Sequence, residues 1–171
     1  MKIFITGVAG FLGSHLADLM LANGHTVAGN DNMIGGYADN VPQGVEFHQV
    51  DCCDLENLTK AMEGCDIVYH TAATAYEGLS VFSPVLVTRN IFEASVTTIT
   101  AAIRNKVKRI VYCSSMARYG HHDEMPYKED YECRPQDPYG IAKKAGEDVL
   151  KNLCETHGVE YVCLLYTSDA A

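Results

Sequence analysis

Short apolar runs alternate with longer amphipathic segments along most of the chain. The runs have strand length and nearly continuous apolar character, whereas the longer segments repeat apolar residues at helical spacing. The expected strands are KIFIT, HTVAG, VEFHQV, DIVYHTA, RIVYCSS and VEYVCLL. Because apolar strands separated by helices usually pair in parallel, the pattern predicts an α/β fold, a Rossmann-type doubly wound parallel sheet covered on both faces.

The segments between these strands predict four helices. They are FLGSHLADLMLAN, LENLTKAME, PVLVTRNIFEASVTTITAAIRN and PYGIAKKAGEDVLKNLCETH. Asp137 is a suitable cap for the last of them, and Pro138 suits its first turn. The chain of 171 residues has no internal repeat and no low-complexity linker, so one domain is expected.

Three glycines in TGVAGFLG, namely Gly7, Gly10 and Gly13, lie between the first expected strand and the first expected helix. Small residues there let the backbone approach a phosphate group closely. The first N–H groups of a helix have no partner within it, and the helix dipole adds positive potential at that end. The stretch therefore predicts a pyrophosphate site.

A carboxylate, Asp31, follows the second expected strand at about the distance from the glycines where an acid binds the ribose hydroxyls of a dinucleotide. No arginine adjoins it in the sequence, and its charge would repel a 2′-phosphate, so NAD is favoured over NADP. The alternative is that Asp31 and Asn32 only begin a turn, and that the glycines only allow the helix to pack on the strand.

Tyr139 and Lys143 are four residues apart, and therefore lie on the same face of the last expected helix. A phenol with a pKa of about 10 is a poor base at neutral pH, but a nearby ammonium group, a helix N-terminus and an oxidised nicotinamide would each lower that pKa. Ser114 and Ser115 end the strand RIVYCSS, and we select Ser115 to hold the reacting oxygen. The alternative is an exposed helical pair without function.

Composition excludes several other classes. The net charge of −9 without a basic cluster argues against nucleic acid, and no stretch reaches the roughly 20 apolar residues that span a membrane. The seven cysteines form no C-x-x-C pair, so reduced thiols in a cytoplasmic protein are expected, with neither disulfides nor a zinc site. We interpret HHDE at 121–124 as a solvated loop, so no metal site is predicted. We interpret His70 as a core residue or as a residue that supports the site from behind, and not as a base.

The motifs TGVAGFLG, DN at 31 and 32, SSMARYG and YGIAK occur in an order that resembles the extended short-chain dehydrogenase/reductase family, specifically its NAD-dependent sugar-nucleotide epimerases and dehydratases. The resemblance runs from Met1 to about Cys163. It implies that Ser115, Tyr139 and Lys143 are catalytic. It also implies cofactor contacts along the pyrophosphate, the adenosine end, the adenine and the nicotinamide side. The pyrophosphate would be held by Gly7, Gly10, Phe11, Leu12 and Gly13, and the adenosine end by Asp31 and Asn32. Asp51 and Cys52 would flank the adenine, and Ala72 and Ala73 would line the nicotinamide side. Asn90 would support the site, and Tyr139 and Lys143 would also contact the cofactor.

For an epimerase, the resemblance implies that Tyr139 removes a proton from a sugar hydroxyl while the carbon passes hydride to NAD, which returns it to the opposite face. Dehydratases of the family carry an Asp-Glu pair after the active-site Ser or Thr, whereas Met116 and Ala117 follow Ser115 here. A nucleotide-sugar 4-epimerase is therefore expected. A reductase or dehydrogenase, a dehydratase, and a non-catalytic NAD-binding module stay open as alternatives.

The resemblance breaks after YVCL, where the family continues with Arg and an N-V-Y-G-P-like stretch and this chain reads LYTSDAA. We therefore expect a dinucleotide-binding domain at 1–164 and a non-native or truncated tail at 165–171. The substrate-binding half would be largely missing, which would leave the fragment inactive and expose an apolar edge. A homodimer is expected for the full-length protein.

Overall fold

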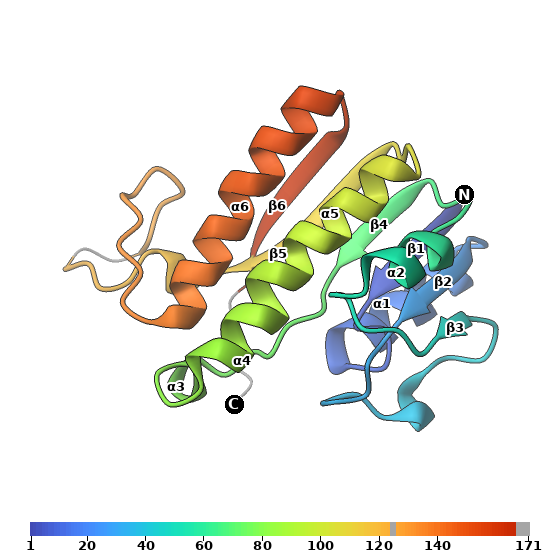
Figure 1. Cartoon of the computed structure of the whole chain (residues 1–171), viewed down its shortest axis with the longest axis horizontal. Helices are drawn as coiled ribbons and strands as arrows, with labels where there is room; N and C mark the ends of the chain where they lie inside the picture. The colour runs from blue at the N-terminus through green and yellow to red at the C-terminus, as the bar shows by residue number, and fades with distance from the viewer. Residues whose placement is uncertain (124–125, 167–171) are drawn as a thin grey trace.

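The computed structural model of the chain describes residues 1–123 and 126–166. Its six strands form one sheet in the order β3-β2-β1-β4-β5-β6, and every neighbouring pair runs parallel (Figure 1). The strands are β1 (Lys2–Thr6), β2 (Thr26–Asn30), β3 (Glu46–His48), β4 (Ile67–His70), β5 (Arg109–Ser115) and β6 (Glu160–Tyr166). The predicted Rossmann-type parallel sheet is therefore confirmed.

Helices connect the strands where the sequence predicts them, with two differences. The helices are α1 (Phe11–Ala22), α2 (Leu55–Ala61), α3 (Glu77–Ser80), α4 (Pro84–Thr88), α5 (Ala94–Arg104) and α6 (Pro138–His157), with short turns η1 (Ala38–Asn40), η2 (Arg89–Glu93) and η3 (Met116–Arg118). The sequence did not predict α3. The long helix expected over 84–105 is a run of α4, the π-helical turn η2 and α5, and such widened turns are common at functional sites.

Alternating side chains of the strands enter two separate cores. Phe4 packs with Ile99 of α5 and Leu150 of α6 on one face of the sheet. Ile3, on the other face, packs with Ala17 of α1. The side-chain alternation along β1 therefore fixes the two faces on which the helices lie.

The helices cover the two faces of the sheet unequally. Figure 1 shows α2, α5 and α6 together on the face toward the viewer, whereas α1 packs on the opposite face against β1 and β2. On β6, Val162 and Leu164 remain 40% and 46% exposed. Helices therefore cover both faces near β1, and the apolar surface at β6 agrees with the exposed apolar edge that the sequence analysis expects.

Local capping fixes both ends of α6. Asp137 accepts a hydrogen bond from the N–H of Gly140 at 2.7 Å, Pro138 occupies the first turn, and Gly158 ends the helix with a φ of 69°. Only glycine adopts this left-handed conformation without a steric cost. The predicted cap and first turn of α6 are confirmed, so the start of the helix that carries Tyr139 is set by its own sequence.

The end of the described chain continues the sheet. Leu165 and Tyr166 pair with Ser114 and Ser115 as part of β6, whereas residues 167–171 of the expected tail lie outside the described residues. The boundary between 1–164 and 165–171 stays a prediction. No helix in the described ranges is long and apolar enough to cross a membrane.

We expect Asp137→Ala to lower the free energy of unfolding by about 1 kcal/mol, because it removes the side-chain acceptor for the first turn of α6. Asp148→Ala on the same helix is the matched control. It breaks only the exposed Lys144–Asp148 pair and should cost about 0.5 kcal/mol or less. Urea unfolding of both variants measures the difference, and equal losses would contradict the capping role.

Candidate active site

A cavity of about 660 Å³ opens at the carboxyl edge of the sheet, where the loops after β1, β2, β3 and β4 meet the end of β5 and the start of α6. Ligands of open parallel sheets bind at this edge. Every residue expected to contact the cofactor lines the cavity, namely Gly7, Gly10, Phe11, Leu12, Gly13, Asp31, Asn32, Asp51, Cys52, Ala72, Ala73, Asn90, Tyr139 and Lys143. The structure thus gathers these residues, while their individual roles stay predictions.

The glycine-rich loop is shaped by close backbone contacts. Gly7 has a φ of 70°, and a Cβ at this position would lie 2.9 Å from the Cα of Ala72. A Cβ at Gly13 would overlap the carbonyl oxygen of Gly7. No side chain caps the first turn of α1, so its N–H groups face the cavity without a competing acceptor from a cap. The loop therefore has the form of an anion-binding turn at a helix N-terminus.

Asp31 is 8% exposed and is held in place by two backbone groups. The N–H of Ala9 in the glycine loop donates to Oδ2 at 3.1 Å, and the N–H of Met33 donates to Oδ1 at 2.8 Å. Each carboxylate oxygen keeps a free lone pair that can accept from a hydroxyl group. The carboxylate is thereby oriented in advance for a diol such as a ribose.

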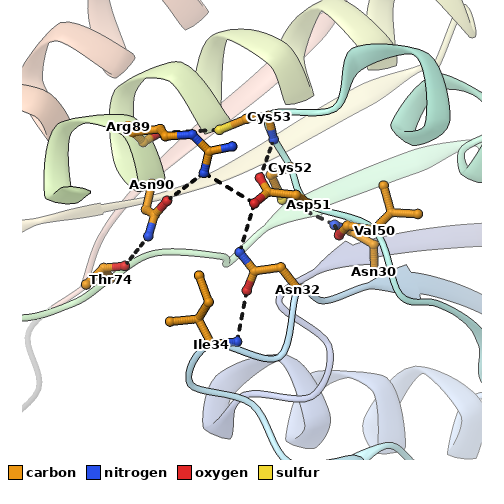
Figure 2. Close-up of polar contacts among 10 residues, drawn as sticks. All are labelled: Asn30, Asn32, Ile34, Val50, Asp51, Cys52, Cys53, Thr74, Arg89 and Asn90. Atoms are coloured by element: carbon orange, nitrogen blue, oxygen red, sulfur yellow. Dashed lines mark hydrogen bonds and ion pairs between the residues drawn. The ribbon is translucent and has the colours of Figure 1, made fainter. Parts of the chain in front are cut away.

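An arginine does lie near this end of the cavity, although none adjoins Asp31 in the sequence. Figure 2 shows Arg89 reaching from η2 toward Asp51, with its guanidinium 3.3 Å from Oδ2, while Asn32 donates to the same oxygen at 3.2 Å. Asn90, the next residue of η2, donates to Thr74 at 3.0 Å. These contacts tie together four of the segments that line the cavity.

Asp51 forms an ion pair with Arg89, and its carboxyl group favours the ionised form. Partial burial alone would raise the pKa of Asp51, but hydrogen bonds from the N–H of Cys53, from Asn32 and from Arg89 outweigh it, so the pKa lies below its usual value. A 2′-phosphate would meet a guanidinium that is already paired. The argument for NAD over NADP therefore holds, with Arg89 as a neighbour that the sequence did not reveal.

Tyr139 and Lys143 lie side by side on α6 and are 7% and 4% exposed. The Lys143 ammonium donates to the carbonyl oxygen of Cys113 at 2.8 Å and lies 5.9 Å from the centre of the Tyr139 ring. Burial lowers the pKa of Lys143 to about 8, although the neighbouring Cys113, Cys163 and Glu147 partly offset it. Lys143 is thus a buried amine whose pKa lies well below that of an ordinary lysine.

Lys143 alone does not bring the pKa of Tyr139 below its ordinary value, and the expectation combines Lys143 with an oxidised nicotinamide. Burial raises the pKa of Tyr139, and a hydrogen bond with Ser115 offsets that effect only in part. The loss of hydration disfavours the phenolate more strongly than its neighbours stabilise it. A further positive charge at the site is needed before Tyr139 can act as a base near neutral pH.

The two serines at the end of β5 have different partners. Ser115 accepts from the N–H of Ala117 at 3.2 Å and bonds with Tyr139, which supports its selection, although its side chain does not line the cavity. Ser114 does line the cavity, but its hydroxyl donates to the buried Glu147. Ser114 is therefore bound to a structural partner, and Ser115 remains the candidate beside Tyr139.

Sequence reasoning missed the ion pair of Glu147 and Arg118, whose carboxylate accepts the hydrogen bond from Ser114. Glu147 is 8% exposed and forms an ion pair of 2.7 Å with Arg118 of η3, whose Nε also donates to the sulfur of Cys133 at 3.0 Å. A weak signal existed, because Glu147 follows Lys143 by one turn of the same helix. Nothing in the sequence pointed to Arg118.

The sites that were discounted show ordinary contacts. His122 bonds to the carbonyl oxygen of Glu132 at 2.9 Å, and His121 lies 3.6 Å from Asp123. Glu124, the last residue of HHDE, lies outside the described residues. Among the described residues, no group of three or more His, Cys, Asp or Glu could hold a metal ion.

Known proteins are similar to this chain over nearly its whole length. The UDP-glucose 4-epimerase of Halalkalibacterium halodurans is 33% identical over 172 residues, which cover 99% of this chain and 51% of that protein. The solved UDP-glucose 4-epimerase of Thermotoga maritima, in complex with UDP-glucose, superposes with a TM-score of 0.93 and 30% identity over 97% of this chain and 55% of that one. The UDP-glucose 4-epimerase of Brucella ovis, solved with NAD, has a TM-score of 0.93 and 31% identity over 98% and 52%.

The chain spans about half the length of the curated relatives it matches. A family sequence model, described as the NAD dependent epimerase/dehydratase family, matches residues 3–168. That match covers the glycine loop, both candidate catalytic residues of α6 and the serines of β5. The chain belongs to the NAD dependent epimerase/dehydratase family.

Proposed function

We propose that the full-length protein is an NAD-dependent nucleotide-sugar 4-epimerase and that this chain forms its dinucleotide-binding half. One observation carries the proposal. A single cavity joins an uncapped helix N-terminus and an oriented carboxylate at one end to Tyr139 and Lys143 at the other. The relatives named UDP-glucose 4-epimerase support the same reaction and favour a UDP-hexose as the substrate.

The chain's own residues fit NAD. The first turn of α1 offers N–H donors to a diphosphate, Asp31 offers acceptors to the ribose hydroxyls, and Asp51 keeps a lone pair on Oδ1 for a donor on the adenine. A Cβ at Gly7 or Gly13 would collide with the backbone of Ala72 or of Gly7, and would distort the loop where the diphosphate is expected. When bound in its oxidised form, NAD supplies a hydride acceptor and a positively charged ring.

Tyr139 would accept the proton of the sugar hydroxyl at the reacting carbon and later return it. That role needs a phenolate, whose formation the buried Lys143 ammonium favours through space. Ser115 bonds with Tyr139 and thereby orients the phenolic oxygen. Lys143 is itself held by the carbonyl oxygen of Cys113, so the three side chains form a fixed set on two rigid elements.

The residues after Ser115 favour a 4-epimerase over a dehydratase. Met116 and Ala117 form part of η3 and carry no acid that could protonate a leaving hydroxyl. Glu147 is the nearby buried carboxylate, and it is already paired with Arg118 and Ser114. A nucleotide-sugar reductase or dehydrogenase is the next candidate, and a non-catalytic NAD-binding module is disfavoured by the preserved set of Ser115, Tyr139 and Lys143.

Three further properties belong to the proposal. The 171-residue chain alone would turn over no nucleotide sugar, since it spans about half the length of the relatives with that activity in their names. A cytoplasmic location is supported by the seven cysteines, all of which are free thiols. A homodimer of the full-length protein rests on the family resemblance.

We expect Gly13→Ala to weaken NAD binding by more than about tenfold, because the added methyl group must displace the backbone of Gly7. Gly78→Ala is the matched control, since a Cβ there meets open space on α3, and its NAD affinity should stay within about twofold of the unchanged chain. Calorimetric titration measures both. Equal affinities would contradict the phosphate site.

In the full-length protein we expect interconversion of UDP-hexoses at C4, with dTDP-hexoses as the comparison substrates. Tyr139→Phe should lower kcat by about a thousandfold while leaving NAD affinity within about twofold, because only the proton-carrying oxygen is lost. Product analysis by NMR decides the reaction. A 4-keto-6-deoxy product, or a fully active Tyr139→Phe variant, would contradict the proposal.

Lys143 should also make the free energy of unfolding depend on pH. Its pKa is about 8 in the folded chain against an ordinary 10.5, so the unfolded chain binds more protons between these pH values and the contribution of Lys143 to stability rises with pH. The stability of Lys143→Met relative to the unchanged chain should therefore fall by up to about 3 kcal/mol from pH 8 to 10.5. Urea unfolding at several pH values measures this, with Lys144→Met as the control, and a constant difference would contradict the buried charge.

A further inference from the structure

We propose that His70 is a positioning residue of the cavity. As a neutral imidazole protonated on Nε2, it connects the cavity wall at Thr71 and Ala72 to the π-helical turn η2. The geometry of the hydrogen bonds is independent of function, but the consequence for ligand binding rests on the proposed function. His70 ends β4 and is 1% exposed, so it cannot contact a ligand directly.

The donors and acceptors of these hydrogen bonds can be assigned from Thr6, the last residue of β1. Its Oγ1 accepts from the N–H of Thr71 and from the N–H of Ala72, both at 3.1 Å. A hydroxyl oxygen has two lone pairs, so both are in use. The hydroxyl proton must therefore point to its third neighbour, Nδ1 of His70 at 2.8 Å, and Nδ1 must be the acceptor.

The second ring nitrogen then carries the proton. In a neutral imidazole one nitrogen donates and the other accepts, so Nε2 of His70 donates to Oγ of Ser95 at 3.0 Å. Ser95 in turn donates to the carbonyl oxygen of Ile91 in η2. The protons of Thr6 and His70 thus each have one possible direction, whereas the hydroxyl of Ser95 reaches the carbonyl oxygen of Ile91 and also, at 3.4 Å, the hydroxyl of Tyr112. We name this series the Thr6–His70–Ser95 chain.

The surroundings keep His70 neutral. Burial and the charge of Lys143 on α6 lower the pKa of His70 to about 3, and the ring of Tyr112 on β5 lies 5.6 Å away. A charged imidazolium would aim a second N–H at Thr6, whose lone pairs are already occupied. The Thr6–His70–Ser95 chain and a neutral His70 therefore require each other.

Both ends of the Thr6–His70–Ser95 chain adjoin the cavity. At one end, Ala72 lines the cavity and lies against Gly7 of the glycine loop. At the other end, Ile91 follows Asn90, which also lines the cavity and donates to Thr74. The segment expected beside the nicotinamide is thus connected to η2 twice. The buried connection runs through His70, and the connection at the cavity surface is the hydrogen bond from Asn90 to Thr74. Loss of the hydroxyl at Thr6 would release the buried contact only.

The first test is the protonation of His70, observed by nitrogen-15 NMR of the histidine-labelled chain. We expect a protonated Nε2 and an unprotonated Nδ1 that do not change between about pH 5 and 8, where ordinary histidines titrate. His70→Gln assigns the signal. A protonated Nδ1, or titration of His70 in this range, would overturn the proposal whether or not the chain binds NAD.

The second test separates positioning from a general loss of structure. Thr6→Val keeps the shape but removes the hydroxyl, whereas Thr6→Ser keeps it, and circular dichroism compares their folds. We expect Thr6→Val to weaken NAD binding about tenfold and ADP-ribose binding less than twofold, with Thr6→Ser close to the unchanged chain. Equal losses for the two ligands, or none, would overturn the positioning role. Failure of the unchanged chain to bind NAD would instead contradict the proposed function.

Discussion

The order of the strands is the constraint on which the site depends. β2 lies on one side of β1 and β5 lies on the far side of β4, so the loops after β1 and β4 leave the sheet in opposite directions. A crevice must open between diverging loops at such a point. The contact of Gly7 with Ala72 marks the base of the crevice, and only a residue without a side chain allows the two backbones to approach so closely.

The protonation of the two candidate catalytic side chains depends on their burial. Burial lowers the pKa of Lys143 and raises the pKa of Tyr139, so both side chains are driven toward their neutral forms. An added positive charge beside Tyr139 would reverse this for the phenol, which is what an oxidised nicotinamide provides. Under the proposed function, the buried pair would thereby link formation of the base to the presence of the oxidised cofactor.

Local sequence signals predicted the parts of the site that lie next to one another in the chain. The glycine loop, Asp31 at the end of β2, and the capped start of α6 with Tyr139 and Lys143 all follow from short-range rules and from parallel pairing. Arg89 was missed because only tertiary packing brings it to Asp51 beside the cavity. The π-helical turn was missed because its residues have the same spacing as an ordinary amphipathic helix.

The central claim is that one dinucleotide spans the cavity from Asp31 to Tyr139, and amide shift mapping by NMR tests it most directly. NAD added to the nitrogen-15-labelled chain should shift amides of the glycine loop, of the segment after β2, and of Ala72 together with the start of α6, whereas AMP should shift only those of the adenosine end. Shifts confined to the surface loop around His122, or no shifts at all, would contradict the account.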